Sequence, residues 1–236
     1  MSICWKVILH RVLAIIPAYN EEESLRTTVE ELKAVAPDID FIVVNDGSAD
    51  DTAGICHRNG YPIIDLPVNG GLTVGFQTGM KYAHRKGYDA AVQFDADGQH
   101  MPQCLHNMID EMDRTDVDIV IGSRFVDEKK DFSARMIGSR LISGIIRLTT
   151  GRKISDPTSG LRLFNRIMIK QFASDSMLNP EPESIAYLIR KGARVSEVQV
   201  AMREREAGES YLSLSKSVAY MVRACTSILF LQWFRS

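Results

Sequence analysis

The sequence is poor in cysteine and has no long uncharged apolar run. Its four cysteines, Cys4, Cys56, Cys104 and Cys225, lack the spacing of a metal site or a redox pair. We therefore expect buried thiols in a reducing compartment. No stretch reaches the roughly 18 uncharged apolar residues of a membrane-spanning helix, so we expect no span.

Linkers, repeats and an excess of charge are missing as well. Without a Pro/Gly/Ser-rich linker, 236 residues predict one large α/β domain. The 28 basic and 30 acidic residues give a formal charge of -2, and we expect no nucleic-acid partner. Residues 1–16 are apolar but contain Lys6, His10 and Arg11 and lead directly into a motif, which predicts a first strand and not a signal peptide.

Short apolar runs alternate with stretches that have helical periodicity. Asn20 and Glu23 have the spacing of a capping box, Gly60 is placed to end a helix, and Pro102 could start one. This alternation predicts a Rossmann-like, mostly parallel sheet with helices on both faces. The predicted strands are residues 12–16, 41–44, 61–66, 89–94 and 118–122.

Polar motifs follow four of these strands. They are residues 17–21, 45–48, 95–99 and 123–124. Ligands of parallel α/β sheets bind beyond the carboxyl ends of the strands, and those ends meet at one edge. The shared placement predicts a single nucleotide-binding edge.

The motif Asp-Ala-Asp-Gly-Gln-His, residues 95–100, is central to this edge. Two carboxylates one residue apart repel each other, and a hard divalent cation relieves the repulsion. Mg²⁺ accepts one or two carboxylates and completes its shell with substrate phosphates, which predicts a metal-bridged diphosphate. Gln99 can turn back toward the ion held by Asp97. An ordinary surface turn is the alternative.

Six motifs occur in order: Pro-x-Tyr-Asn-Glu, Asn-Asp-Gly-Ser, Asp-Ala-Asp-Gly-Gln-His, Gly-Ser-Arg, Asp-Pro-Thr-Ser-Gly-Leu-Arg and Arg-Glu-Ala-Gly-Glu-Ser. Together they resemble the family 2 glycosyltransferases of the A-type fold. The similar branch contains dolichyl-phosphate mannose synthase and bacterial polyprenyl-phosphate glycosyltransferases. The resemblance covers residues 10–211.

This resemblance implies a nucleotide-sugar donor, UDP- or GDP-linked, and a site for Mg²⁺ or Mn²⁺. The mannose synthases have a lysine where this chain has Tyr211, which removes one donor-phosphate cation. The residues alone leave open that Tyr19 covers the core, that His100 packs, and that Arg203 replaces Arg205. The implied donor contacts are Pro17, Tyr19, Glu21, Val44, Asp46, Asp95, Ala96, Asp97, Arg124 and Arg205; Asp95, Asp97, Arg124 and Arg205 are the catalytic set, and Asp97 and Gln99 the metal ligands.

Two apolar segments bear on membrane association. Residues 135–152 predict an arginine-rich helix. It is either a core helix with solvated arginines or an interfacial helix on anionic lipid, and the resemblance favours the second. Residues 218–234 carry one charge, Arg223, and predict an amphipathic anchor or a dock for a small integral-membrane partner, with burial in the domain as the alternative. We expect a catalytic domain at 1–212, a C-terminal helix at 213–236, and a cytoplasmic protein on the cytoplasmic face of a membrane.

The implied reaction moves a sugar to undecaprenyl or dolichyl phosphate. Such a phosphate is already an anion, so attack with inversion needs no strong base, and Ser159 and Arg162 are the candidates to hold it. The alternative is extension of a lipid-linked or cell-wall glycan on a sugar hydroxyl, which needs a base from Asp156, Glu181 or Glu183. A catalytically silent subunit that binds a membrane protein is the third hypothesis.

Overall fold

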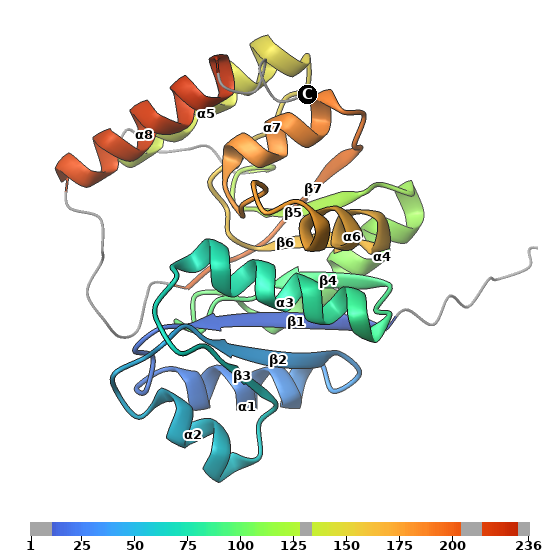
Figure 1. Cartoon of the computed structure of the whole chain (residues 1–236). Coiled ribbons are helices and arrows are strands. Elements are labelled where there is room, and N and C mark those ends of the chain that lie inside the picture. Colours follow the sequence, from blue (N-terminus) through green and yellow to red (C-terminus); the bar gives the residue numbers. More distant parts are fainter. Residues whose placement is uncertain (1–10, 128–133, 204–213, 231–236) are drawn as a thin grey trace, which may run out of the picture.

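A seven-stranded sheet runs through the centre of the molecule (Figure 1). The computed structural model describes residues 11–127, 134–203 and 214–230. The strand order is β3-β2-β1-β4-β6-β5-β7, and only β6 runs antiparallel to its neighbours among these strands. The predicted mostly parallel sheet is confirmed. The strands are β1 Val12–Ala18, β2 Asp40–Asn45, β3 Ile63–Asp65, β4 Ala90–Gln93, β5 Ile119–Ser123, β6 Arg162–Asn165 and β7 Val195–Gln199.

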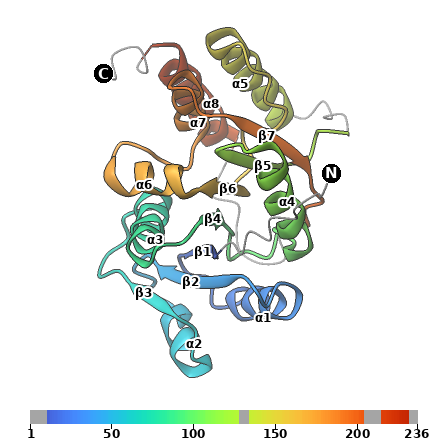
Figure 2. The same cartoon turned by 90° about the vertical axis from the view of Figure 1, so that its right-hand side faces the viewer.

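Helices cover both faces of the sheet (Figures 1 and 2). Alternate side chains of β1 point to opposite faces. Leu13 and Ile15 belong to an apolar cluster that also contains residues of α3, α5, α6, α7 and α8, and Ala14 and Ile16 belong to a second cluster with residues of α1, α2 and α4. The helices are α1 Leu25–Val35, α2 Thr52–Asn59, α3 Leu72–Lys86, α4 Leu105–Thr115, α5 Ala134–Thr150, α6 Arg166–Ser174, α7 Pro182–Arg190 and α8 Leu214–Leu229, with a 3₁₀ turn η1 at Pro102–Cys104.

Local sequence signals located the strands better than the first helix. The predicted end at Gly60 is confirmed, because this residue is left-handed and caps α2. The predicted capping box is wrong: α1 begins at Leu25 after Ser24, and the Asn20 side chain instead accepts a hydrogen bond from the Ala49 N–H at 2.9 Å. Tertiary contact between the loops after β1 and β2 outweighs the local cap.

Helices α5 and α8 lie side by side along one side of the molecule (Figure 1). Gly138 of α5 permits the close approach, since a Cβ there would be 1.6 Å from Met221 Sδ. Ile142 on α5 and Ile228 on α8 are wholly buried. One side of α8 is therefore part of the core, as the burial alternative predicted. The predicted domain boundary at residue 212 falls in 204–213, outside the described residues.

None of the described helices combines the length and the apolar character needed to cross a bilayer.

A buried arginine joins β6 to two loops. The Arg162 side chain is 1% exposed, and it donates hydrogen bonds to the carbonyl oxygens of Pro157 and Pro180, each at 2.8 Å. Burial lowers the pKa of Arg162, and the negative charge of Glu181 opposes that effect. Arg162 thereby fixes the segment before α7 to the loop that precedes β6.

A second buried polar contact holds α8 to α7. The Tyr220 hydroxyl donates to Glu181 Oε2 at 2.5 Å. Burial raises the pKa of Glu181, and this hydrogen bond lowers it in part. Through Glu181, this contact links the surroundings of Arg162 to the C-terminal helix α8.

We expect Arg162→Ala to lower the free energy of unfolding by about 3 to 5 kcal/mol, because it leaves two buried carbonyls and nearby acidic groups uncompensated. Urea unfolding followed by circular dichroism measures the loss. Arg166→Ala is the matched control, since Arg166 forms an ion pair with Asp89 on the surface and should cost no more than about 1 kcal/mol. Similar losses in both variants would contradict the role of Arg162.

We expect Glu181→Gln to gain stability relative to wild type as the pH rises from about 4 to 7. The raised pKa of Glu181 means that the folded state keeps a proton that the unfolded chain releases earlier, so wild type loses stability across this window. Unfolding of both proteins over this range measures the difference. Glu30→Gln is the control with the opposite sign, because the hydrogen bond from Tyr61 lowers the pKa of Glu30. A difference independent of pH for Glu181→Gln would contradict the assignment.

Candidate active site

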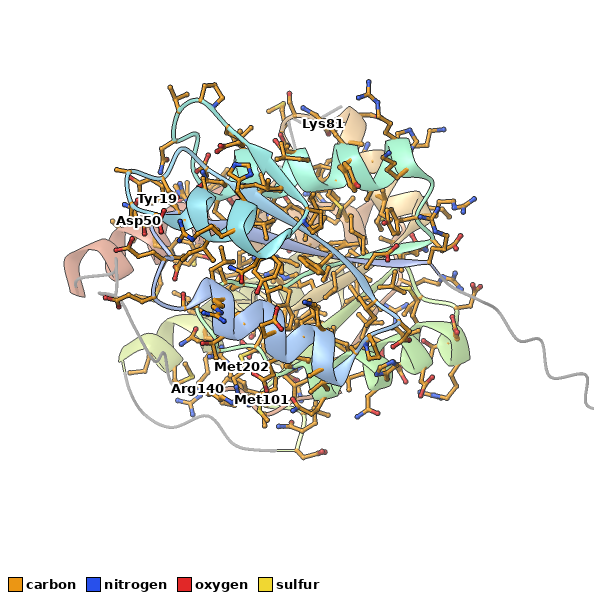
Figure 3. All side chains as sticks on the ribbon, turned by 90° about the horizontal axis from the view of Figure 1, so that it is seen from below. Tyr19, Asp50, Lys81, Met101, Arg140 and Met202 are labelled. Carbon is orange, nitrogen blue, oxygen red and sulfur yellow. The ribbon has the colours of Figure 1, made fainter. Side chains whose placement is uncertain are left out.

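A cleft of about 420 Å³ lies at the carboxyl ends of β1, β2 and β4. Parallel strands bring the loops that follow them to one edge, as the sequence predicted. Tyr19 and Asp50, both labelled in Figure 3, lie on the loops that follow β1 and β2, and these loops are joined by a hydrogen bond from the Glu22 N–H to Asp50 Oδ2 at 3.0 Å. The cleft is lined by Pro17, Ala18, Tyr19, Glu21, Asp46, Asn69, Gly71, Leu72, Gly75, Asp95, Ala96 and Asp97.

Asp46 holds a glycine turn that forms one wall of the cleft. Its two carboxylate oxygens accept hydrogen bonds from the backbone N–H groups of Gly70 and Gly71, at 2.8 and 2.7 Å. Gly71 has a φ of +83°, and α3 begins at the next residue. A helix N-terminus favours negative charge, so the turn presents a positive dipole to the cleft. The predicted site did not include this wall, although Asn69-Gly70-Gly71 is a turn signal in the sequence.

Asp95 is fixed by neighbours on both sides. Gln93 Nε2 donates to Asp95 Oδ1 at 3.0 Å. His100 Nδ1 accepts the backbone N–H of Asp95 at 2.9 Å, which assigns the proton of the neutral ring to Nε2. His100 Nε2 lies 3.6 Å from Asp95 Oδ2. His100 is 4% exposed and lies edge-on to Phe94, so the structure supports the packing alternative for this residue.

Asp97 and Gln99 share a tight turn. The Gln99 N–H donates to Asp97 Oδ1 at 3.1 Å, and Gly98 between them has a φ of +76°. Among the described residues no three His, Cys, Asp or Glu side chains are close enough to hold a metal. One carboxylate and one amide oxygen, those of Asp97 and Gln99, fit Mg²⁺ or Mn²⁺, which completes its shell with phosphate and water. Asp97 and Gln99 would hold such an ion.

The loop of residues 156–160 lies directly against Asp95. A Cβ on Gly160 would be 2.9 Å from Asp95 Oδ2, so only glycine leaves this space. Ser159 is 1% exposed, and its hydroxyl donates to the Gly122 carbonyl oxygen at 2.5 Å. The predicted acceptor residues Ser159 and Arg162 are therefore both buried and bonded to main-chain carbonyls. Direct contact with a lipid phosphate does not fit this placement, and we correct their role to positioning the loop.

Arg124 forms a two-pronged ion pair with Asp156. Its Nε and Nη2 lie 2.7 and 3.0 Å from Oδ2 and Oδ1 of Asp156. The Asp156 side chain is wholly buried and that of Arg124 is 22% exposed. The guanidinium therefore faces Asp156 and not the cleft, and contact with a diphosphate stays a prediction. The two residues are 32 positions apart, and no sequence signal links them.

The other predicted donor residues divide into three groups. Pro17, Tyr19, Glu21 and Ala96 line the cleft, as do Asp46, Asp95 and Asp97. The Val44 side chain is wholly buried in the core and does not line it. Arg205 lies outside the described residues, as does Tyr211. Arg203, the alternative to Arg205, forms two hydrogen bonds of 2.7 Å with Glu31, which attach it to α1.

Residues 13–172 match the sequence family described as glycosyl transferase family 2. The undecaprenyl-phosphate mannosyltransferase of Micrococcus luteus is 32% identical over 86% of this chain and 88% of its own. The polyprenol monophosphomannose synthase of Mycolicibacterium smegmatis is 30% identical over 86% of this chain and 81% of its own.

Solved structures show the same fold. Glucosyl-3-phosphoglycerate synthase from Mycobacterium tuberculosis, in complex with phosphoglyceric acid, has a TM-score of 0.69 at 16% identity and covers 93% of this chain and 80% of its own. A mannosyltransferase from Pyrobaculum calidifontis, in complex with GDP-mannose and Mn²⁺, has a TM-score of 0.68 at 16% identity. The match covers 96% of this chain and 65% of the mannosyltransferase chain. The mostly parallel sheet, the cleft at its carboxyl edge and these similarities together show that the chain is a glycosyltransferase of family 2 with the A-type fold.

Proposed function

We propose that the protein transfers one sugar from a UDP- or GDP-linked donor to a polyprenyl phosphate, with Mg²⁺ or Mn²⁺ and with inversion at the anomeric carbon. The observation that carries the proposal is the cleft that gathers Asp46, Asp95 and Asp97 beside the start of α3. The relatives named for transfer to undecaprenyl phosphate or for polyprenol monophosphomannose synthesis, 32% and 30% identical, support the lipid acceptor.

The donor diphosphate would lie between the metal-binding turn and the α3 N-terminus. Asp97 and Gln99 would hold the ion, which supplies charge stabilisation for the leaving diphosphate. The dipole at the start of α3 favours the same anion. Tyr19 and Pro17 line the part of the cleft where the nucleoside would bind. Gln93 and His100 fix the carboxylate of Asp95 beside the donor.

The burial and the hydrogen bonds of the three candidate bases favour a phosphate acceptor. Asp156 is buried in its ion pair with Arg124, Glu181 accepts a hydrogen bond from Tyr220, and Glu183 is 9% exposed. None of the three lines the cleft. A sugar hydroxyl would need a base to take its proton, whereas a polyprenyl phosphate attacks as an anion. In-line attack opposite the leaving diphosphate inverts the anomeric carbon.

In this proposal the enzyme works at the cytoplasmic face of a membrane, as a catalytic domain (1–212) followed by a C-terminal helix (213–236). Val222 on α8 and Phe230, directly after this helix, are each 60% exposed. These side chains could contact lipid or a small integral-membrane partner.

The experiment that tests the function is nucleotide release from a panel of UDP- and GDP-sugars, with Mg²⁺ or Mn²⁺, with and without a polyprenyl phosphate. We expect release from one donor that depends on both the metal and the lipid phosphate. Release that requires a saccharide acceptor would support the glycan-extending alternative. No release from any donor would support a silent subunit.

We expect Asp97→Asn to lower metal-dependent turnover by about 100-fold or more, because it removes a charged ligand and with it most of the stabilisation that the ion provides. Asparagine keeps an oxygen that can accept the Gln99 N–H, so the turn should survive. Asp110→Asn, on the exposed side of α4, removes the same charge and should leave turnover unchanged. Near wild-type turnover of Asp97→Asn would remove Asp97 from the metal site.

A further inference from the structure

The metal-binding turn, residues 96–99, is held at both ends by hydrogen bonds from distant parts of the chain. At one end the hydroxyl of Thr28 on α1 donates to the Ala96 carbonyl oxygen at 3.0 Å. At the other end the backbone N–H of Arg203 donates to the Gln99 carbonyl oxygen at 3.1 Å. Two elements outside the motif therefore set where the turn lies relative to the sheet.

The segment that carries Arg203 runs alongside this turn. Strand β7 ends at Gln199, and residues 202–203 continue from it. Met202, labelled in Figure 3, forms an antiparallel β-bridge with His100. The bridge and the hydrogen bond from Arg203 to Gln99 are neighbouring contacts of one short antiparallel pairing. The position of the Arg203 backbone thus fixes the main chain of Gln99.

The side chain of Arg203 is anchored in turn by Glu31 on α1. Its Nη1 and Nη2 each lie 2.7 Å from one carboxylate oxygen of Glu31. The two side chains are 36% and 23% exposed, so water screens the pair only in part. The hydrogen bonds from Arg203 lower the pKa of Glu31, which keeps this carboxylate ionised at neutral pH. A two-pronged pair of this kind is both stronger and more directional than a single hydrogen bond.

Thr28 and Glu31 belong to the same side of α1. They are three positions apart, which places them one above the other on a helix. This side of α1 contacts the metal-binding turn directly through Thr28 and indirectly through Arg203. None of Thr28, Glu31 and Arg203 lines the donor cleft. Their effect on a bound ion would therefore pass through the turn.

We propose that Thr28 and the Glu31–Arg203 pair are positioning residues that hold Asp97 and Gln99 in the geometry a divalent cation requires. The hydrogen bond from the Gln99 N–H to Asp97 links these two residues to each other but does not fix the turn to the rest of the fold. Thr28 and Arg203 provide that attachment. The inference rests on the metal dependence in the proposed function and adds residues that the cleft itself does not contain.

The test is binding of Mn²⁺ by the full-length protein, with UDP in one series and GDP in another, followed by the electron paramagnetic resonance signal of free Mn²⁺. We expect Arg203→Met and Thr28→Val each to raise the Kd for Mn²⁺ by about tenfold, a loss typical of residues that orient metal ligands. Thr28→Val preserves side-chain volume and tests the inference independently of the ion pair. Because both variants keep Asp97 and Gln99, nucleotide release at saturating Mn²⁺ should stay near the wild-type rate.

Glu31→Gln separates this role from direct binding of the donor diphosphate by Arg203. A positioning role predicts weaker Mn²⁺ binding in this variant, because the ion pair loses its negative charge. If Glu31 only kept a donor-binding arginine away from the cleft, the same variant would bind Mn²⁺ and nucleotide as tightly as wild type or more tightly. That result would overturn the inference.

The matched control is Lys33→Met. Lys33 is also a cation paired with a glutamate of α1, since its Nζ lies 2.9 Å from Glu30 Oε1, and the pair is exposed. This variant should bind Mn²⁺ within about twofold of wild type, because an exposed ion pair contributes little. Equal Mn²⁺ affinity in wild type, Arg203→Met and Thr28→Val would overturn the inference and leave the metal site intact. A wild-type protein that binds no Mn²⁺ with either nucleotide would overturn the metal site itself, and with it both the inference and the metal dependence of the proposed function.

Discussion

The rest of the structure depends on the buried guanidinium of Arg162. A buried charge is stable only when hydrogen bonds and opposite charges compensate its lost hydration. Here the carbonyls of Pro157 and Pro180 provide the hydrogen bonds, and the negative charge of Glu181 opposes the effect of burial. Because the two carbonyls belong to separate loops, the hydrogen bonds from Arg162 hold both loops at the start of β6. The requirement is strict, since a displaced loop would expose an uncompensated charge to the core.

The loop of residues 156–160 carries this constraint into the active site. Gly160 reaches Asp95, and Asp156 orients the Arg124 side chain. In the other direction, Glu181 meets Tyr220 on α8. The donor cleft and the C-terminal helix therefore rest on one buried polar network. Helix α5 packs against the same α8.

The acidic residues at the carboxyl edge of the sheet have different roles. Asp46 uses both oxygens to hold the turn before α3, and Asp95 is fixed by Gln93 and by the ring of His100. Asp97 lines the cleft on the short turn that it shares with Gln99. The motif alone suggested one shared task for these acids. Their hydrogen bonds show that Asp46 holds a backbone turn, whereas the carboxylate of Asp95 is held by a side chain.

The sequence by itself determined the order of β1 to β5 and of the helices between them, the mostly parallel sheet and the edge where the motifs meet. These features follow from local periodicity and from the geometry of parallel strands. Each chain segment specifies its own periodicity without a distant partner. Only the tertiary structure decided that Arg162 and Ser159 are buried, that Arg124 faces Asp156, and that Asn20 joins two loops and does not cap α1. The same holds for the antiparallel strand β6, whose four residues begin with a charged arginine. In each case the deciding partner is distant in sequence, and burial and ion pairing depend on where the folded chain brings that partner.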